Sequence, residues 1–164
     1  MRKLLLLITT ILCLVGCAPV ISSQSLQLVD NSISFAELRQ APERHIDKHL
    51  FLAGEIAAAR NTNDGGELEI IQFPSDEQGK ITDRDKSGGR FIAKASDFLE
   101  PAVYRNGLQV TLVGKVLGKK TMQLDSVDYT YPVLAVHEIY LWKTEELRRP
   151  PMFHFGIGVG TIIH

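Results

Sequence analysis

Cysteine is scarce in this chain: the 164 residues contain only Cys13 and Cys17, both within the N-terminal stretch. If the chain is cut before Cys17 and that residue is chemically modified, as the neighbouring residues suggest below, no free thiol remains. A disulfide framework, a cysteine-based metal site and a thiol nucleophile are then all excluded from the mature protein.

Concentrated positive charge is also lacking. Eighteen Lys and Arg residues nearly balance 19 Asp and Glu residues, which leaves a formal net charge of −1, and the basic residues are scattered along the chain. Binding of nucleic acid depends on clustered positive charge. We therefore expect no nucleic-acid partner.

Catalytic signatures are missing as well. The sequence has no Gly-x-Ser-x-Gly elbow, no His-Glu-x-x-His pair and no phosphate-binding glycine loop. His137, His154 and His164 share no ligand-like spacing. We expect a protein that is not an enzyme and has no catalytic residues.

Two stretches resemble parts of metal sites. Residues 83–88 open like a calcium loop, but Lys94 occupies the twelfth position, where a glutamate would close the cage. His45 and His49 have the spacing of zinc ligands on a helix, although Pro42 and an expected strand start near His49 disfavour a helix there. We expect no metal site.

The N-terminal stretch has the order of an export signal. Arg2 and Lys3 precede an apolar run over residues 4–15 that is too short for a membrane-spanning helix. The run ends in Leu14, Val15, Gly16 and Cys17. Unlike the Ala-x-Ala-like end of an ordinary secretory signal, these four residues resemble the lipobox of bacterial lipoproteins.

The lipobox resemblance implies a signal peptide over residues 1–16 and a lipid on Cys17, which is the only cofactor-like group that we expect. Three acyl chains, each gaining about 0.8 kcal/mol per buried methylene, would hold the protein on a membrane. Ala18 stands where an aspartate would favour the inner membrane. The resemblance therefore implies a lipid anchor in the outer membrane, with the protein on the periplasmic side.

Beyond the anchor the sequence predicts one domain. We expect a tether over residues 17–33, a domain over residues 34–149 and a tail over residues 150–164. Ser34 and Glu37 form a capping box for a short helix over residues 35–40. Alternating and apolar stretches predict five strands, with a single helical turn at residues 96–99 between the third and the fourth. The expected strands cover residues 49–60, 67–73, 90–94, 108–116 and 131–142.

Five strands, a strand-bending Gly54 and a short helix indicate a mainly β protein with a small five-stranded OB-like barrel. An irregular two-sheet sandwich is the alternative. Either architecture suits a single domain of this length.

Aromatic residues gather toward the end of the domain. They could form a platform that stacks on sugars or contacts a partner protein, or they could belong to the core and rim of the barrel. The residues in question are Tyr129, Tyr131, Tyr140 and Trp142, with Tyr104 earlier in the chain.

The tail alternates between bulky and small residues. On an extended chain the bulky side chains would share one face, opposite Gly156, Gly158 and Gly160. We expect this segment to dock on the domain or to mediate self-association rather than to insert into the membrane. Addition to a partner's sheet edge is a further possibility. The bulky residues that carry this hypothesis are Phe153, Phe155, Ile157 and Val159.

Several local motifs add to the lipobox. They are Gly89-Arg90-Phe91, Phe98-Leu99-Glu100-Pro101, the stretch 104–114, Tyr131-Pro132-Val133 and Tyr140-Leu141-Trp142. With them, most of residues 1–145 resembles the Slp family of starvation-inducible outer-membrane lipoproteins. Glu100 departs mildly from the pattern, in which an aspartate is more usual. The resemblance implies a small envelope lipoprotein linked to stationary phase or stress, with no active residues to carry over.

Together these observations predict an outer-membrane lipoprotein of the cell envelope with a structural or stress-related role and no catalysis. A homo-oligomer is compatible with the tail. The alternative is a binding module for cell-wall glycan or peptide, or for an envelope protein.

Overall fold

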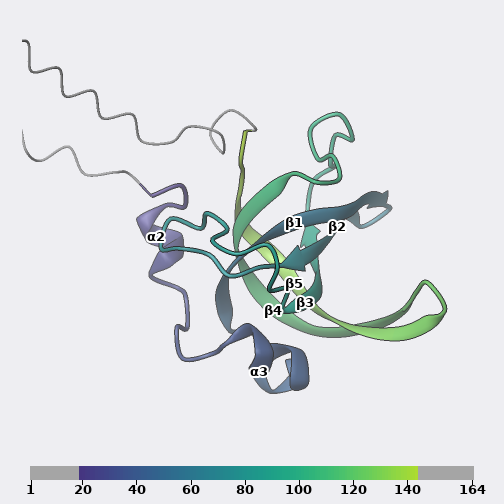
Figure 1. Ribbon diagram of the computed structural model, residues 1–164, viewed down its shortest axis with the longest axis horizontal. Coiled ribbons are helices and arrows are strands. Elements are labelled where there is room, and N and C mark those ends of the chain that lie inside the picture. Colours follow the sequence, from purple (N-terminus) through teal and green to yellow (C-terminus); the bar gives the residue numbers. More distant parts are fainter. Residues whose placement is uncertain (1–18, 144–164) are drawn as a thin grey trace, which may run out of the picture.

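The computed structural model describes residues 19–143, and in these the dominant feature is a closed barrel of five strands in the order β1-β2-β3-β5-β4 (Figure 1). All neighbouring strands are antiparallel except β3 and β5, which run parallel. The expected mainly β, five-stranded OB-like architecture is confirmed. The strands are β1 (His49–Thr62), β2 (Gly65–Gln72), β3 (Gly89–Ala95), β4 (Gln109–Leu124) and β5 (Val127–Leu141).

The barrel interior is filled by one apolar cluster to which every strand contributes. Strand alternation sorts the side chains: on β2, Leu68 and Ile70 are fully buried in this cluster, so Glu67 and Glu69 point to the outer face. The core residues are Leu38, Leu50, Leu52, Ile56, Leu68, Ile70, Phe91, Ala93, Leu99, Val110, Leu112, Val116 and Leu134.

Gly54 lies where β1 pairs with β2 on one side and with β4 on the other. A Cβ at this position would come within 2.4 Å of the Ile71 carbonyl oxygen. Only glycine allows this close approach, and a β-bulge follows between Ile56 and Ala58. The placement of a glycine at a strongly curved point of the first strand agrees with the prediction.

The hairpin of β4 and β5 is longer than predicted. We expected the fourth strand to end at residue 116 and the fifth to begin at residue 131, but the two strands stay paired as far as Leu124 and Val127. Asp125 turns the chain with a φ of 55°. The hairpin therefore extends well beyond the barrel wall, as the long green ribbon of Figure 1 shows.

The helices precede the barrel. Helix α3 (Phe35–Gln40) has the predicted bounds, and its capping box is formed by Ser34 and Glu37. A 3-10 helix, η1 (Pro42–His45), follows it.

The prediction of a helical turn at residues 96–99 is wrong. The Asn61 side chain accepts a hydrogen bond from Leu99 N–H at 2.8 Å and donates one to the Leu99 carbonyl at 2.9 Å. In addition, Gly66 N–H donates to the Asp97 carbonyl. The backbone groups that a helical turn would need are therefore bonded to the β1–β2 hairpin.

The tether expected over residues 17–33 does not hold for the residues that the structure describes. Residues 19–33 include a one-turn helix, α2 (Ser23–Leu26), and Ile21 is only 1% exposed. Val29 forms a parallel bridge with His49 at the start of β1. Within residues 19–143, no helix combines the length and the apolarity that crossing a membrane requires.

Candidate functional site

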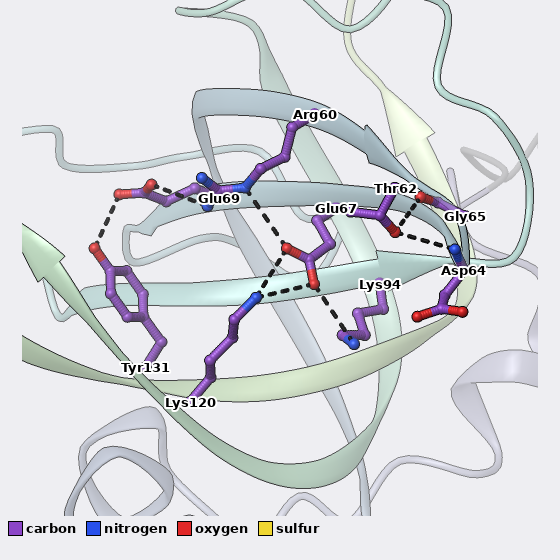
Figure 2. Close-up of polar contacts among 9 residues, drawn as sticks. All are labelled: Arg60, Thr62, Asp64, Gly65, Glu67, Glu69, Lys94, Lys120 and Tyr131. Carbon is purple, nitrogen blue, oxygen red and sulfur yellow. Dashed lines mark hydrogen bonds and ion pairs between the residues drawn. The ribbon is translucent and has the colours of Figure 1, made fainter.

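An ionic cluster covers the outer face of β2, and we call it the β2 ionic cluster (Figure 2). Its centre consists of Glu67 and Glu69, whose side chains are only 6% and 11% exposed. Four cations from three strands, β1, β3 and β4, surround them. The contacts are Glu67 with Arg60 (3.6 Å), Lys94 (3.5 Å) and Lys120 (3.2 Å), and Glu69 with Arg60 (3.7 Å) and Arg90 (2.6 Å).

Two opposing effects act on the pKa of Glu67, burial and the neighbouring lysines. Burial alone would raise its pKa, but the hydrogen bonds and charges of Lys120 and Lys94 outweigh burial and lower the pKa below the usual value. The carboxylate therefore stays ionised. Since Lys120 lies on the β4–β5 hairpin and Glu67 on β2, this contact fastens the hairpin to the barrel wall.

The same cluster leaves a surplus of positive charge, because four cations face two carboxylates. Arg60, Lys94 and Lys120 keep 44%, 43% and 42% of their side-chain surface exposed. The strand 2–3 face is also the face on which OB-folds bind ligands. This surface is therefore suited to bind ligands that carry anionic groups.

The first pair of predicted aromatic residues belongs to this face. The rings of Tyr129 and Tyr131 are 4.6 Å apart. The Tyr131 hydroxyl donates to Glu69 Oε1 at 3.2 Å, and the Tyr129 hydroxyl accepts from Arg90 N–H at 2.9 Å. Burial raises the pKa of Tyr131, and the negative charge of Glu69 raises it further. Tyr131 is only 1% exposed and packs with Ile92 and Val133 in a second small core.

The second pair lies at the other end of β5. Tyr140 and Trp142 make an edge-to-face contact at 5.2 Å, and Trp142 is 8% exposed. Trp142 Nε1 donates to Thr111 Oγ1 at 2.9 Å. The four aromatic residues thus form two separate pairs, each with a buried member. This arrangement is closer to the core-and-rim alternative than to a single exposed platform.

A groove of about 410 Å³ lies beside Trp142, which is one of the predicted site residues. Its walls combine aliphatic side chains with two cationic ones. The lining residues are Ala102, Val103, Arg105, Leu108, Leu141, Trp142 and Lys143.

A third polar centre joins the N-terminal segment to the barrel, and sequence reasoning missed it. Glu138 on β5 accepts from Ser22 N–H at 2.9 Å, from Ser22 Oγ at 2.6 Å and from Ser25 Oγ. The hydroxyl groups of Ser22 and Ser25, in that order of effect, lower the pKa of Glu138. The carboxylate is therefore ionised and fully engaged by its own chain.

A small cavity of about 220 Å³ brings His137 and Glu138 close to Ser96 and Asp97. These residue types could serve a hydrolase, but Glu138 already accepts three hydrogen bonds from Ser22 and Ser25. The His137 ring meets the edge of His49 at 5.7 Å. Burial lowers the pKa of His49, and His137 lowers it further.

The partial metal motifs are occupied by protein contacts. In the calcium-like stretch, Lys86 forms an ion pair with Asp83 at 3.0 Å, and Arg84 pairs with Glu55. Over residues 19–143 no group of three or more His, Cys, Asp or Glu side chains is arranged to hold a metal ion.

Two sets of predicted site residues lie outside residues 19–143. These are the lipobox with its lipid acceptor, Leu14, Val15, Gly16 and Cys17, and the tail residues Phe153, Phe155, Ile157 and Val159. Both sets stay predictions.

Comparison with known proteins gives one family match. A family model described as the Outer membrane lipoprotein Slp family matches residues 14–157. Outer membrane protein Slp of Escherichia coli is 26% identical over 114 residues, which is 70% of this chain. An uncharacterized protein of Haemophilus influenzae is 27% identical over 96 residues, or 58% of this chain. The matches span 60% and 52% of the lengths of these two relatives.

Solved structures resemble the barrel only distantly. A mitochondrial single-stranded DNA-binding protein from S. cerevisiae has a TM-score of 0.37 and 16% identity, covering 58% of this chain and 95% of that one. A small single-stranded DNA-binding protein from Streptomyces coelicolor has a TM-score of 0.34 and 12% identity, covering 60% of this chain and 97% of that one. Likeness at this level says nothing about what the present chain binds.

Proposed function

Because this chain belongs to the outer membrane lipoprotein Slp family, we propose that it is a structural, non-catalytic lipoprotein that helps the envelope withstand starvation or similar stress. In this proposal Cys17 carries the lipid, and the barrel lies on the periplasmic side of the outer membrane. The family match gives the protein class and its membrane, and the role and the anchor residue are the proposed part.

One observation carries the non-catalytic proposal: the buried acidic groups serve the protein's own contacts. Glu67 and Glu69 hold the β4–β5 hairpin to β2 and β3, and Glu138 holds the N-terminal segment. Among residues 19–143 no buried side-chain nitrogen or oxygen lacks a hydrogen-bond partner. A catalytic carboxylate must be able to exchange a proton with the substrate. The oxygens of Glu67, Glu69 and Glu138 instead accept hydrogen bonds or form ion pairs within the protein.

The test uses a strain without the protein, complemented with single variants and scored for envelope permeability after carbon starvation. Cys17→Ser is expected to abolish complementation, because it removes the residue to which the lipid is attached. His137→Ala is expected to complement fully, because the exposed imidazole has no catalytic task. Immunoblots of fractionated envelopes check that each variant accumulates to the level of the original protein.

Two outcomes would contradict the proposal. Loss of complementation by His137→Ala at normal protein level would indicate chemistry at the small cavity that it lines. Full complementation by an unlipidated Cys17→Ser protein found outside the membrane fraction would show that the protein's role does not require the lipid anchor.

The groove beside Trp142 favours a second candidate, a binding module for cell-wall peptide or glycan. Its apolar walls and the Arg105 guanidinium suit a ligand with a carboxylate and small aliphatic side chains, such as a peptide stem. Arg105→Gln should weaken binding of peptidoglycan fragments in calorimetric titration without affecting the fold. No heat of binding to the original protein at millimolar fragment would eliminate this candidate.

A further inference from the structure

We infer that residues 19–30, which we call the N-terminal strap, seat the barrel directly on the lipid surface in one orientation, with the β4–β5 hairpin pointing into the periplasm. The inference rests on the proposed lipid at Cys17. It assigns the barrel one side that faces the membrane. A flexible tether would instead let the domain rotate freely relative to the membrane.

The strap is fastened to the barrel at its beginning. Ile21 is buried, at 1% exposure, and Ser25 is 4% exposed. Glu138 on β5 accepts the Ser22 N–H and both hydroxyls. Hydrogen bonds to a charged acceptor are stronger than neutral ones, so this contact holds the first turn of the strap in place.

A second fastening lies at the end of the strap. Val29 bridges to His49, and Asp30 N–H donates to the His49 carbonyl at 2.9 Å. Lys48 and Asp30 form an ion pair at 3.1 Å. Contacts at both ends leave the strap little freedom to swing away from β1 and β5.

The covalent reach between lipid and barrel is therefore short. Four residue steps separate Cys17 from the buried Ile21, and a fully extended chain covers at most about 14 Å in four steps. A free tether ending at residue 33 would instead span up to about 55 Å. The strap thus limits the barrel to positions next to the headgroups.

The composition of the strap suits this position. Residues 18–29 contain no charged side chain, so this part of the strap brings no carboxylate to the phosphate groups of the lipids. Its exposed residues are small, amide-bearing or apolar. They are Pro19, Ser23, Gln24, Gln27 and Leu28.

The hairpin points the other way. In Figure 1, α2 and the tip of the β4–β5 hairpin lie at opposite sides of the molecule. Val127 at that tip is 68% exposed. When the strap meets the lipid surface, this tip is the part farthest from it.

The test places a fluorescent reporter at one of two exposed positions, Glu77→Cys or Val127→Cys. Glu77 lines a groove together with Leu26 and Val29 of the strap, whereas Val127 lies at the hairpin tip. Cys13 and Cys17 are the only natural cysteines, and neither remains as a free thiol in the lipidated protein. The lipidated proteins are reconstituted in phosphatidylethanolamine and phosphatidylglycerol vesicles that contain a headgroup-attached quencher.

We expect strong quenching at position 77 and almost none at position 127. Two further changes should remove the quenching at position 77. One is a 12-residue Gly-Ser insertion before Pro19, which adds about 20 Å of root-mean-square reach. The other is the double variant Ser22→Ala and Ser25→Ala, which frees the beginning of the strap.

Equal quenching at both positions, or quenching at position 77 that survives the insertion, would overturn the inference. Flotation of the same vesicles separates this failure from failure of the anchor. A protein that floats with vesicles but shows equal quenching has a lipid and no fixed orientation. A protein that does not float, like the Cys17→Ser control, has no anchor at all.

Discussion

Tyr131 places a phenol hydroxyl 3.2 Å from the Glu69 carboxylate, in a position where only 1% of the residue reaches solvent. The neutral phenol can donate to the carboxylate, but a phenolate would add a second negative charge beside it. Burial and Glu69 both raise the pKa of Tyr131 for this reason. The contact ties the β4–β5 hairpin to β2.

Tyr131→Phe should therefore change both stability and its pH dependence. Near neutral pH we expect a loss of about 1.5–3 kcal/mol in the free energy of unfolding, because one hydrogen bond to a charged acceptor disappears. The folded-state pKa is raised above the ordinary value of 10.0, so the contribution of Tyr131 is complete below pH 10 and is lost as pH rises through the folded pKa. Urea unfolding at several pH values measures the effect, and the variant should lose less stability than the original protein above pH 10.

Equal losses for the two proteins above pH 10 would contradict this account. Tyr104→Phe is the matched control, because it also removes a phenol hydroxyl, but from a partly buried tyrosine that packs against the main core rather than beside Glu69. It should leave the alkaline loss of stability unchanged.

Residue identity alone could not predict the polar centres. The alternation of Glu67, Leu68, Glu69 and Ile70 correctly assigns the faces of β2, but it suggests that both glutamates meet water. They are buried because the β4–β5 hairpin and its cations cover them, and this hairpin packs on β2 and β3 from far along the chain. Glu138 was missed for the same reason: its partner Ser22 is 116 residues away.

At the scale of elements, Gly54 and Gly107 are required for different reasons. Gly54 has no room for a Cβ beside the Ile71 carbonyl. Gly107 has ample room, with its nearest neighbour at 4.0 Å, but its φ is +85°. Substituting each glycine with alanine therefore tests one effect at a time, steric crowding at Gly54 and backbone strain at Gly107.

Gly54→Ala should destabilise the barrel by about 3 kcal/mol, the upper part of the range for overpacked sites, because backbone atoms of β2 must move. Gly107→Ala should cost about 1 kcal/mol through its positive φ alone. Thermal unfolding of the two variants and the original protein measures both. A smaller loss for Gly54→Ala than for Gly107→Ala would show that β1 and β2 can separate freely at this point.

Elements with local signals were predictable, and those decided by distant contacts were not. The bounds of α3 follow from the capping box of Ser34 and Glu37, which lie three residues apart. The stretch 96–99 has comparable local signals, yet Asn61 and Gly66 of the β1–β2 hairpin hold its backbone in a non-helical form. Residues 19–33 belong to the stretch that looks like a linker by composition, and only their contacts with His49 and Glu138 show that they pack on the barrel.

At the scale of the whole molecule, we predict that the tail docks on the domain or mediates self-association. The unlipidated Cys17→Ser protein should form a defined oligomer or a monomer with the tail docked, and deletion of residues 153–164 should change its oligomeric state or its solubility. The physical reason is that Phe153, Phe155, Ile157 and Val159 occupy every second position, which would place them on one apolar face of an extended chain.

Sedimentation velocity and solubility measurements of the two proteins check this prediction. A control that replaces Thr161 with Ala keeps the apolar face and should behave like the full-length protein. If the truncated protein matches the full-length protein in both measurements, the tail has neither role.

The ladders of the barrel also set the order in which it can fold. The β1–β2 and β4–β5 ladders join neighbouring strands through short turns, so loop closure is fast for both. The β1–β4 ladder joins His49 to Lys115, and the β3–β5 ladder joins Ile92 to Val133, so both wait until distant parts of the chain meet. Two preformed hairpins therefore come together late, and a nascent chain that has not yet delivered residues 127–141 cannot close its barrel.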